Sequence, residues 1–241
     1  MSPPLGLLAD VVPFSWVDGP GNRFVAFFQG CSFDCLACHN PHTIPLASVH
    51  ARQVTVEGLV DEVRPHAPFL SGVTVSGGEA TLQADFVRAF FSAIKGDPDL
   101  GRLTTFVDTN GGCGPEVWDA LIPVLDGAMV DLKALDPDLH QRVAGASNEP
   151  VLASIRQLAA TGRLYEVRLL LVPGVNDSPD QLAATAEWLL AVDPALRVKV
   201  IGFRPHGVRA AAREWPSPTD EQRAAYRALL AAAGVRELVV V

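Results

Sequence analysis

The densest group of reactive side chains in this sequence is a short run of cysteines. Three of the four cysteines, Cys31, Cys35 and Cys38, have the spacing C-x3-C-x2-C and directly follow the apolar run Phe24 to Phe28. Three thiolates on one short loop can bind a single metal centre. A four-iron cubane takes one ligand per iron, so three cysteines leave one iron open to a ligand that is not protein. The spacing therefore predicts a [4Fe-4S] cluster with one open position.

Two other uses of these cysteines must be weighed. A disulfide framework is typical of short secreted chains with an even number of cysteines, and nothing in this sequence indicates secretion. A structural zinc ion is the stronger alternative, because His39 or His42 could complete a Cys3His set. Zinc loops usually pair two ligands with two others at a distance, which differs from the spacing in this loop.

The length and composition predict one domain over residues 1–241. Of the 241 residues, 49% are hydrophobic, so the chain can bury a substantial core. This length suits one α/β domain better than two small ones. The net charge of −8 argues against a broad phosphate-binding surface, which would need clustered Lys and Arg. We therefore expect no nucleic acid partner.

No part of the sequence has the pattern of a membrane or export segment. Residues Met1 to Asp10 contain no basic n-region, and no apolar run approaches the roughly 20 residues that a membrane span requires. Clustered cysteines also suit a reducing compartment better than scattered pairs would. These features predict a cytoplasmic protein without a membrane partner.

Strand and helix signals alternate along the chain. Strands are predicted from short apolar or β-branched runs, and helices from longer stretches with apolar residues three and four apart. The predicted strands are Phe24 to Phe28, Val73 to Ser76, Thr104 to Asp108, Ala128 to Asp131, Val167 to Val172 and Val198 to Phe203. The predicted helices are Glu57 to Arg64, Gln83 to Lys95, Pro115 to Leu125, Val151 to Thr161, Ser178 to Val192 and Thr219 to Ala233, before an apolar tail, Leu238 to Val241.

This alternation indicates a parallel sheet with right-handed crossovers. Six units are fewer than the eight of a closed TIM barrel, so we predict an α/β fold with a partial (β/α)6 barrel. In such barrels the reactive residues lie on loops at the C-terminal ends of the strands. Any one such loop could be an ordinary turn, but six on one rim favour a site. After the cysteine loop, the strand ends carry Gly77-Gly78-Glu79, Asp108-Thr109-Asn110-Gly111, Asp131-Leu132-Lys133, Pro173-Gly174-Val175-Asn176-Asp177 and Arg204-Pro205-His206.

The cysteine spacing resembles the signature of the radical S-adenosylmethionine (SAM) superfamily. The wider block from Asp18-Gly19-Pro20-Gly21 to Cys38-His39-Asn40 is similar to that of the activases of glycyl radical enzymes, which include the pyruvate formate-lyase activase. Three further segments resemble the YjjW-type activases: Pro13-Phe14-Ser15, Val73 to Ala80 and Gly202 to Gly207. The likeness runs from about Val12 to Trp215. It implies a radical SAM fold and an oxidoreductase of anaerobic metabolism.

The tripeptide Gly77-Gly78-Glu79 is a candidate ligand site. The two glycines lack a Cβ, so a ligand could approach the backbone closely, and Glu79 could accept hydrogen bonds from an ammonium group. Alone, such a tripeptide would be an ordinary turn. The resemblance implies that it binds the amino group of the methionine part of SAM.

Two aspartates at strand ends, Asp108 and Asp131, could contact a ligand or a cation. They could equally cap a helix or lie in a solvated turn. The resemblance implies that these aspartates, together with Thr109 and Met129, bind a monovalent cation beside the SAM carboxylate.

The resemblance implies further SAM contacts. Lys133 could pair with carboxylate or ribose oxygens, or extend along the surface. His206 matches a family position that contacts SAM, although a single His in a loop is more often merely exposed. Ala37, His39 and Leu132 belong to the same implied site. Ala37 stands where the family usually has an aromatic residue whose main chain meets the adenine, so lost stacking could weaken adenine binding.

Two residues have no role in this scheme. Arg168 lies in an apolar strand, which suggests a buried partner such as a carboxylate. Cys113 lies in the glycine-rich stretch 111–114, far in sequence from the cluster loop, and we predict a thiol outside the cluster and outside any disulfide.

The resemblance also implies a mechanism. SAM binds the open iron through its amino and carboxylate groups, and one electron from the reduced cluster breaks the bond between sulfur and C5′. The products are methionine and a 5′-deoxyadenosyl radical, which takes a hydrogen atom from the α-carbon of a glycine in a glycyl radical enzyme. We expect a monomer whose open barrel admits the partner's glycine loop.

The absence of a cysteine-rich insert indicates how the cluster would receive electrons. Many activases carry a cysteine-rich, ferredoxin-like insert after the cluster loop, but residues 40–72 contain no cysteine. One cluster is therefore the limit, and a flavodoxin or ferredoxin-type reductant must reduce it directly.

Other classes of protein remain open at this point. A radical SAM enzyme that acts on a small molecule would share the cluster and SAM motifs, and would form 5′-deoxyadenosine without a glycyl radical partner. A zinc-stabilised binding module would be colourless and hold stoichiometric zinc. An activator of anaerobic ribonucleotide reductase is the nearest sibling, and such proteins are typically shorter.

Overall fold

The computed structural model describes residues 4–241, so the first three residues of the predicted 1–241 domain lie outside the described residues. The described chain forms two compact units. The first unit contains the chain up to Ser32, His42–Thr109 and Cys113–Met129, and the second contains Phe33–Pro41, Asn110–Gly112 and Val130–Val241. That the whole chain acts as one domain stays a prediction.

The strands are hydrogen-bonded in the order β3-β1-β2-β4-β5-β6-β7-β8-β9. Strand β1 pairs antiparallel with β2 and β3, whereas β2–β4, β4–β5, β7–β8 and β8–β9 are parallel pairs. The architecture is the predicted α/β class, in which helices connect the parallel strands. The strands are β1 (Gly6–Ser15), β2 (Arg23–Phe28), β3 (Arg52–Val54), β4 (Gly72–Gly77), β5 (Thr104–Thr109), β6 (Gly127–Asp131), β7 (Leu164–Leu171), β8 (Arg197–Gly202) and β9 (Glu237–Val240).

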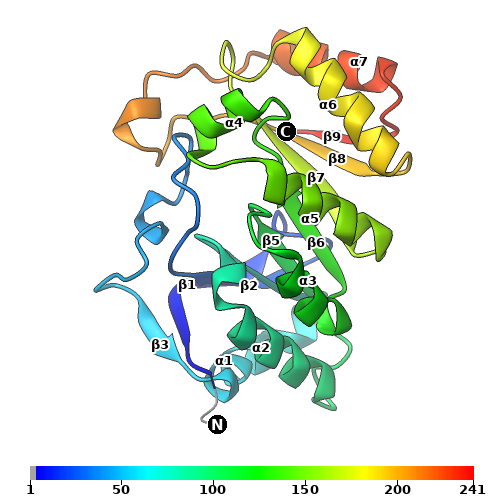
Figure 1. Ribbon diagram of the computed structural model, residues 1–241. Helices are drawn as coiled ribbons and strands as arrows, with labels where there is room; N and C mark the ends of the chain where they lie inside the picture. Colours follow the sequence, from blue (N-terminus) through cyan, green and yellow to red (C-terminus); the bar gives the residue numbers. More distant parts are fainter. Residues whose placement is uncertain (1–3) are drawn as a thin grey trace. The chain divides into compact units, whose positions relative to one another are not determined.

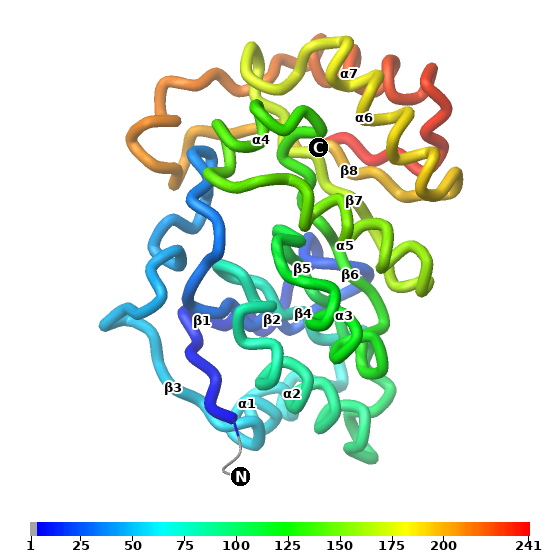
Figure 2. Tube along the Cα trace, viewed as in Figure 1, coloured from blue at the N-terminus to red at the C-terminus, as the bar shows by residue number. Residues whose placement is uncertain are grey.

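The first unit is built on β2, β4 and β5 with three α-helices. The α-helices are α1 (Val56–Val63), α2 (Ala84–Gly96) and α3 (Pro115–Leu121), and the 3-10 turns are η1 (Pro41–Thr43), η2 (Arg64–Phe69), η3 (Ala80–Gln83) and η4 (Ile122–Val124). Helices α1 and α2 lie side by side (Figures 1 and 2). Strand β2 is apolar on both faces, with Phe24, Val25, Ala26 and Phe28 all buried. This is the pattern of a parallel strand covered on two sides.

A buried arginine fixes the start of these strands. The guanidinium of Arg23, at 0% exposure, donates to the hydroxyl groups of Thr74 and Thr104 and to the carbonyl oxygens of Val73, Thr104 and Pro20. It also lies over the ring of Phe106, 4.5 Å from the centroid. The Asp18-Gly19-Pro20-Gly21 segment is thereby held to β4 and β5, since Thr74 also donates to the carbonyl oxygen of Asp18.

The second unit contains β7, β8 and β9 with the other four α-helices. These helices are α4 (Pro137–Ala144), α5 (Glu149–Ala160), α6 (Pro179–Val192) and α7 (Asp220–Ala232), with a 3-10 turn η5 (Ala210–Ala212). Helices α6 and α7 lie side by side (Figure 1). Their starts are capped by side chains, Ser178 for α6 and Thr219 for α7, and Thr219 forms a reciprocal capping box with Gln222.

All six predicted strands and all six predicted helices are present, with ends within a few residues. Four elements were not predicted: β1, β3, α4 and β9. Strand β1 contains Asp10 and Pro13, which interrupt a strand pattern, and β3 has only three residues. In the part of the chain that the structure describes, no helix is long and apolar enough to cross a membrane.

Candidate functional site

The first cysteine of the loop follows β2 in the first unit. The chain turns at Gly30, whose φ of +98° favours glycine. The turn is fixed by backbone hydrogen bonds from Gly30 N to the Thr43 carbonyl (2.8 Å) and from Cys31 N to the Ile44 carbonyl (3.0 Å). The Gln29 amide group adds two bonds, to the carbonyl oxygens of His42 and Pro45. Cys31 therefore stands at a rigid strand end and is partly exposed.

The other two cysteines lie in the second unit against the end of α4. Asp34 N donates to the Ala144 carbonyl and Leu36 N to the Val143 carbonyl, each at 3.0 Å. The Cys35 thiol lies 4.0 Å from the same Ala144 oxygen. Helix α4 ends here because Gly145 adopts φ +72°, where an added Cβ would come within 3.3 Å of Asp34 Cβ. The helix that sequence reasoning missed thus supports two of the three cysteines.

Burial is the main cause of the pKa shifts of these two thiols. It raises the pKa of both Cys35 and Cys38, against the opposing positive charges of Lys133 and Arg209. None of the cysteines among the described residues forms a disulfide, so the thiols are available as ligands. Binding to iron would remove their protons, as it does for any cysteine ligand.

The two glycines of the Gly77-Gly78-Glu79 motif lie where the chain packs closely against its own backbone. Their expected role in the approach of a ligand stays a prediction. An added Cβ at Gly77 would lie 2.2 Å from Phe28 N, and one at Gly78 would lie 2.2 Å from the Gly30 carbonyl oxygen and 2.6 Å from that of Thr43. The space is filled by the chain's own backbone, including the cysteine loop. The glycines therefore bring the motif against that loop, and Gly78 N and Glu79 N donate to the carbonyl oxygens of Phe28 and Gly30.

Glu79 is buried and held by three donors. Its Oε1 accepts from Thr81 N (3.0 Å), from the Thr81 hydroxyl (2.7 Å) and from the Thr109 hydroxyl (2.8 Å). The side chain is 1% exposed. These hydrogen bonds fix the orientation of the carboxyl group at the C-terminal ends of β4 and β5. Thr81 was not predicted, and the only available signal was its position two residues after Glu79.

The four predicted cation ligands are divided between the units. Asp108, Thr109 and Met129 belong to the first and Asp131 to the second. Asp108 accepts a hydrogen bond of 3.1 Å from the Ser76 hydroxyl, and Met129 is fully buried. Within the described residues, no group of three or more His, Cys, Asp or Glu side chains is arranged to hold a single metal ion. A four-iron cluster has a different requirement, since each cysteine binds its own iron.

Asp131 and Lys133 form an ion pair at the end of β6, with Nζ 2.6 Å from Oδ2. Burial disfavours the charged form of Lys133, but the charge and hydrogen bond of Asp131, together with the two nearby cysteines, outweigh it, so the pKa of Lys133 is raised. Asn176, from the loop after β7, donates to the Lys133 and Leu170 carbonyl oxygens and accepts from Val172 N. This buried amide fixes the Lys133 backbone. From the sequence, Asn176 was predicted only as a residue of the loop after a strand.

The segment after β8 runs along the cysteine loop within the second unit. His39 Nε2 donates to the Arg204 carbonyl at 2.9 Å, and the His39 ring lies 5.9 Å from that of Phe203. Ala37 packs against the apolar cluster that contains Phe203 and Val208. His206 is exposed in the same segment. Sequence reasoning proposed His39 as a zinc or SAM ligand, and the structure shows it joining two loops.

The two residues without a predicted role are now placed. Arg168 is buried, with Nε 2.9 Å from Glu166 Oε1, so the predicted carboxylate partner is confirmed. Arg197 approaches the other oxygen of Glu166, also at 2.9 Å. Cys113 is partly exposed and forms no disulfide.

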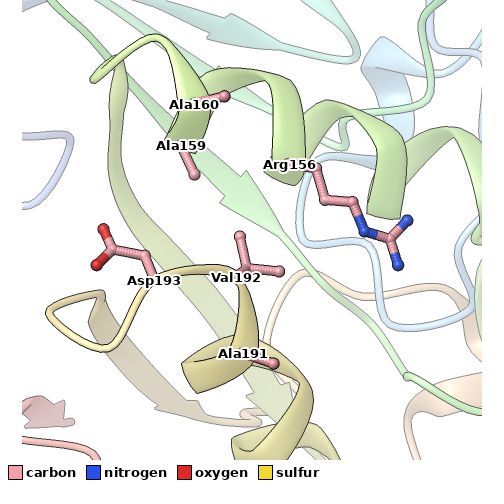
Figure 3. A pocket seen from close by; sticks show the side chains of 6 residues that line it. All are labelled: Arg156, Ala159, Ala160, Ala191, Val192 and Asp193. Carbon is pink, nitrogen blue, oxygen red and sulfur yellow. The ribbon is translucent and has the colours of Figure 1, made fainter.

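One surface pocket lies apart from these residues. It has a volume of about 340 Å³ and lies between α5 and α6 (Figure 3). Its lining residues are Arg156, Ala159, Ala160, Ala191, Val192 and Asp193. The Arg156 guanidinium lies over the ring of Trp188, 5.0 Å from the centroid. No residue of the predicted site belongs to this lining.

Comparison with known proteins shows the family to which this chain belongs. The pattern of the radical SAM superfamily matches residues 25–189, more than half of the chain. The chain is 36% identical over 207 residues to the pyruvate formate-lyase-activating enzyme of Streptococcus mutans, covering 84% of this chain and 79% of that protein. It is 34% identical over 213 residues to the enzyme of the same name from Staphylococcus aureus, covering 84% and 83%. The chain therefore belongs to the radical SAM superfamily, in the family that includes these relatives.

Solved structures support the same fold. A domain of the pyruvate-formate lyase-activating enzyme from Bacteroides vulgatus superposes with a TM-score of 0.57 at 23% identity, covering 71% of this chain and 99% of that one. A radical SAM methyltransferase from Sphaerobacter thermophilus superposes with a TM-score of 0.68 at 20% identity, covering 91% and 66%. The prediction of a partial barrel of the radical SAM type is thereby confirmed.

Members of this superfamily use a [4Fe-4S] cluster and SAM, and the donors of this chain fit both. Three cysteines outside any disulfide follow the predicted spacing, which leaves one iron for a further ligand. A buried carboxylate with fixed orientation, Glu79, suits the ammonium group of an amino acid.

Proposed function

We propose that this protein is a radical SAM activase that generates a glycyl radical on a partner enzyme. The observation that carries the proposal is identity of 36% over 84% of the chain to an enzyme named for activating pyruvate formate-lyase, in a chain that keeps the three-cysteine loop. A glycyl radical enzyme is the protein substrate.

When bound, the reduced cluster would supply one electron to cleave the bond between sulfur and C5′ of SAM, which gives methionine and a 5′-deoxyadenosyl radical. This radical would abstract a hydrogen atom from the α-carbon of a glycine in the partner enzyme. In the proposal, Cys31, Cys35 and Cys38 hold the cluster. Glu79, held in place by Thr81 and Thr109, accepts from the SAM ammonium group. The protein's contribution is to orient the reacting atoms and to keep water out.

Other residues complete the proposed SAM site. Lys133, held by Asp131 and by Asn176, is a cation for the carboxylate or ribose oxygens. The backbone of Ala37 meets the adenine, with Gly77, Gly78, His39, Leu132 and His206 in the same site. Asp108, Thr109, Met129 and Asp131 are the proposed ligands of a monovalent cation.

The setting of the reaction is part of the proposal. We infer that a flavodoxin or ferredoxin-type protein reduces the cluster, that the activase is a monomer, and that it works in the cytoplasm without a membrane partner. The net charge of −8 supports the absence of a nucleic acid partner.

The test is anaerobic reconstitution with iron and sulfide, followed by electron paramagnetic resonance (EPR) of the dithionite-reduced protein with and without SAM. A reduced four-iron signal that changes shape with SAM supports the proposal. The protein is then incubated with pyruvate formate-lyase and SAM, and a glycyl radical signal is expected. A cluster that makes 5′-deoxyadenosine only with a small molecule would instead indicate a different radical SAM enzyme. Stoichiometric zinc and no cluster would overturn the proposal.

A further inference from the structure

The segment from Phe203 to Arg209 follows the cysteine loop backward, from His39 toward Asp34. At its start, the Arg204 carbonyl accepts from His39 Nε2 at 2.9 Å. Further along, an added Cβ on Gly207 would lie 3.4 Å from the His39 carbonyl oxygen. At its end, the Arg209 guanidinium forms an ion pair with Asp34. Contacts at both ends hold this segment beside the loop that contains Cys35 and Cys38.

Arg209 therefore carries a positive charge next to two of the proposed cluster ligands. Asp34 directly precedes Cys35, so the ion pair holds the guanidinium at the start of the turn from Cys35 to Cys38. The hydrogen bond with Asp34 raises the pKa of Arg209, so its charge is held in this position. Lys133, paired with Asp131, acts on the same two thiols. The Arg209–Asp34 ion pair thus holds the positive charge of Arg209 beside the residue that directly precedes Cys35.

Solvent exposure differs within the Arg209–Asp34 pair. The Arg209 side chain is 26% exposed, whereas that of Asp34 is 67% exposed. Charges in water are screened more strongly than partly buried ones. The carboxylate therefore cancels only part of the field of the guanidinium at the sulfur atoms, and a net positive potential remains.

We propose that Arg209 raises the reduction potential of the [4Fe-4S] cluster, and that Asp34 positions Arg209 and moderates its effect. This inference rests on the proposed function, because it requires that the cysteine loop binds the cluster. Net charge near a cluster is one of the factors that set its potential. Adding an electron makes the cluster more negative, so a nearby cation stabilises the reduced form more than the oxidised one.

The consequence lies in the supply of electrons. An external donor reduces this cluster directly, because residues 40–72 carry no cysteines for a second cluster. A cation at the cluster loop makes that reduction more favourable for a donor of given potential. Arg209 is accordingly a positioning and tuning residue and is not proposed to touch the reacting atoms.

The test is an EPR-monitored redox titration of the reconstituted protein without SAM, on samples matched for iron and sulfide content. We expect Arg209→Gln to lower the midpoint potential of the reduced/oxidised couple, and Arg209→Lys to retain most of the native value. Asp34→Asn removes the negative charge but keeps an oxygen that can accept from the Arg209 guanidinium, so Arg209 stays in place. This variant should shift the potential upward, by less than the Arg209→Gln decrease, because Asp34 is more exposed. Arg213→Gln, an exposed arginine of the same connection, serves as the charge-matched control and should leave the potential unchanged.

The outcomes separate this inference from the proposed function. An Arg209→Gln protein with an intact cluster and the native potential overturns the inference and leaves the activase proposal standing. An equal decrease in Arg213→Gln also overturns it, since the effect would then be general. If Arg209→Gln does not retain a cluster, Asp34→Asn decides: an increased potential supports the inference and an unchanged or decreased one overturns it. Failure of the native protein to bind a cluster would refute the proposed function itself.

Discussion

The hydroxyl group of Thr109, the last residue of β5, donates a hydrogen bond of 2.8 Å to Oε1 of Glu79, which follows β4. Neighbouring parallel strands thus end in a donor and an acceptor that contact each other. Both groups are buried, at 4% and 1% exposure, so water does not compete for the bond. This contact orients the carboxylate that we propose for the SAM ammonium group.

Thr109→Val removes this donor and keeps the shape of the side chain. We expect SAM affinity to fall about tenfold, since a hydrogen bond to a charged group contributes roughly 1.5–3 kcal/mol. Thr109→Ser keeps the hydroxyl and should bind SAM nearly as well as the native protein. The dissociation constant is measured on the reconstituted protein from the change in its EPR signal. Native affinity in Thr109→Val would mean that the Thr109 hydroxyl is not needed to orient Glu79.

The four cysteines are expected to differ in their effect on iron content. Replacing Cys31, Cys35 or Cys38 by Ser should abolish or severely reduce iron and sulfide binding, because each of these cysteines is the ligand of one iron. Cys113→Ser should retain the native content. The measurement is iron and acid-labile sulfide per chain after anaerobic reconstitution. Equal loss in the Cys113 variant would show that the assignment of ligands is incomplete.

Glu166 neutralises a buried arginine, and its removal should be costly. In Glu166→Gln, Arg168 keeps its buried charge and loses the ion pair with Glu166, and breaking a buried pair typically costs about 3–5 kcal/mol. The free energy of unfolding is measured in urea. The double variant Glu166→Leu with Arg168→Met should recover most of the loss, because no unpaired charge remains buried. Glu187→Gln, on an exposed position of α6, is the control and should stay within about 0.5 kcal/mol of native.

If Glu166→Gln proved as stable as that control, the predicted cost of breaking the Arg168–Glu166 pair would be wrong. Arg197 is 35% exposed, so water can stabilise its charge when Glu166 is lost. Comparison of Glu166→Gln in the native and Arg197→Gln backgrounds would then separate the two contacts.

His140 should make the protein less stable as the pH falls. It is fully buried, donates from Nδ1 to the Ala146 carbonyl at 2.7 Å, and its Nε2 has no hydrogen-bond partner among the described residues. Burial lowers the pKa of His140 in the folded protein. Between the unfolded pKa of about 6.5 and the lower folded pKa, the unfolded state binds more protons, so stability is lost as the pH decreases through that window.

The slope of this loss approaches about 1.4 kcal/mol per pH unit for one group. Urea unfolding at about pH 7.5 and about pH 5.5, on either side of the unperturbed pKa, measures it. His140→Gln should have a smaller stability difference between the two pH values than the native protein. The exposed His50, changed to Gln, should leave the native difference intact. An unchanged difference in His140→Gln would assign the pH dependence to other groups.

The parallel core was predictable because its signals are local. Each buried strand, such as β2, is a short apolar run, and each connecting helix has apolar residues on one side. Helix α4 was missed although its end signals are present: Asp136 caps it, Pro137 begins it and Gly145 ends it. Its apolar side is short, so hydrophobic periodicity alone was too weak to show it.

The chemistry of the site was predictable at the level of motifs, and its supports were not. Cysteine spacing is a local property, whereas Asp34 and Arg209 are separated by 175 positions and meet only through folding. Asn176 was correctly placed on a loop, but its contact with the Lys133 carbonyl depends on how β6 and β7 end. Partners that are distant in sequence leave no periodic signal in either segment.

The close packing at Gly77 and Gly78 has a consequence for the evolution of this protein. Every single-nucleotide change of a glycine codon that alters the amino acid introduces a side chain or ends translation. At these two positions any side chain would collide with main-chain atoms at 2.2 Å, and main-chain atoms cannot rotate away as a flexible side chain can. We therefore expect no other amino acid to be tolerated at either position, whatever substrate the protein comes to act on. The restriction arises from the path of its own chain.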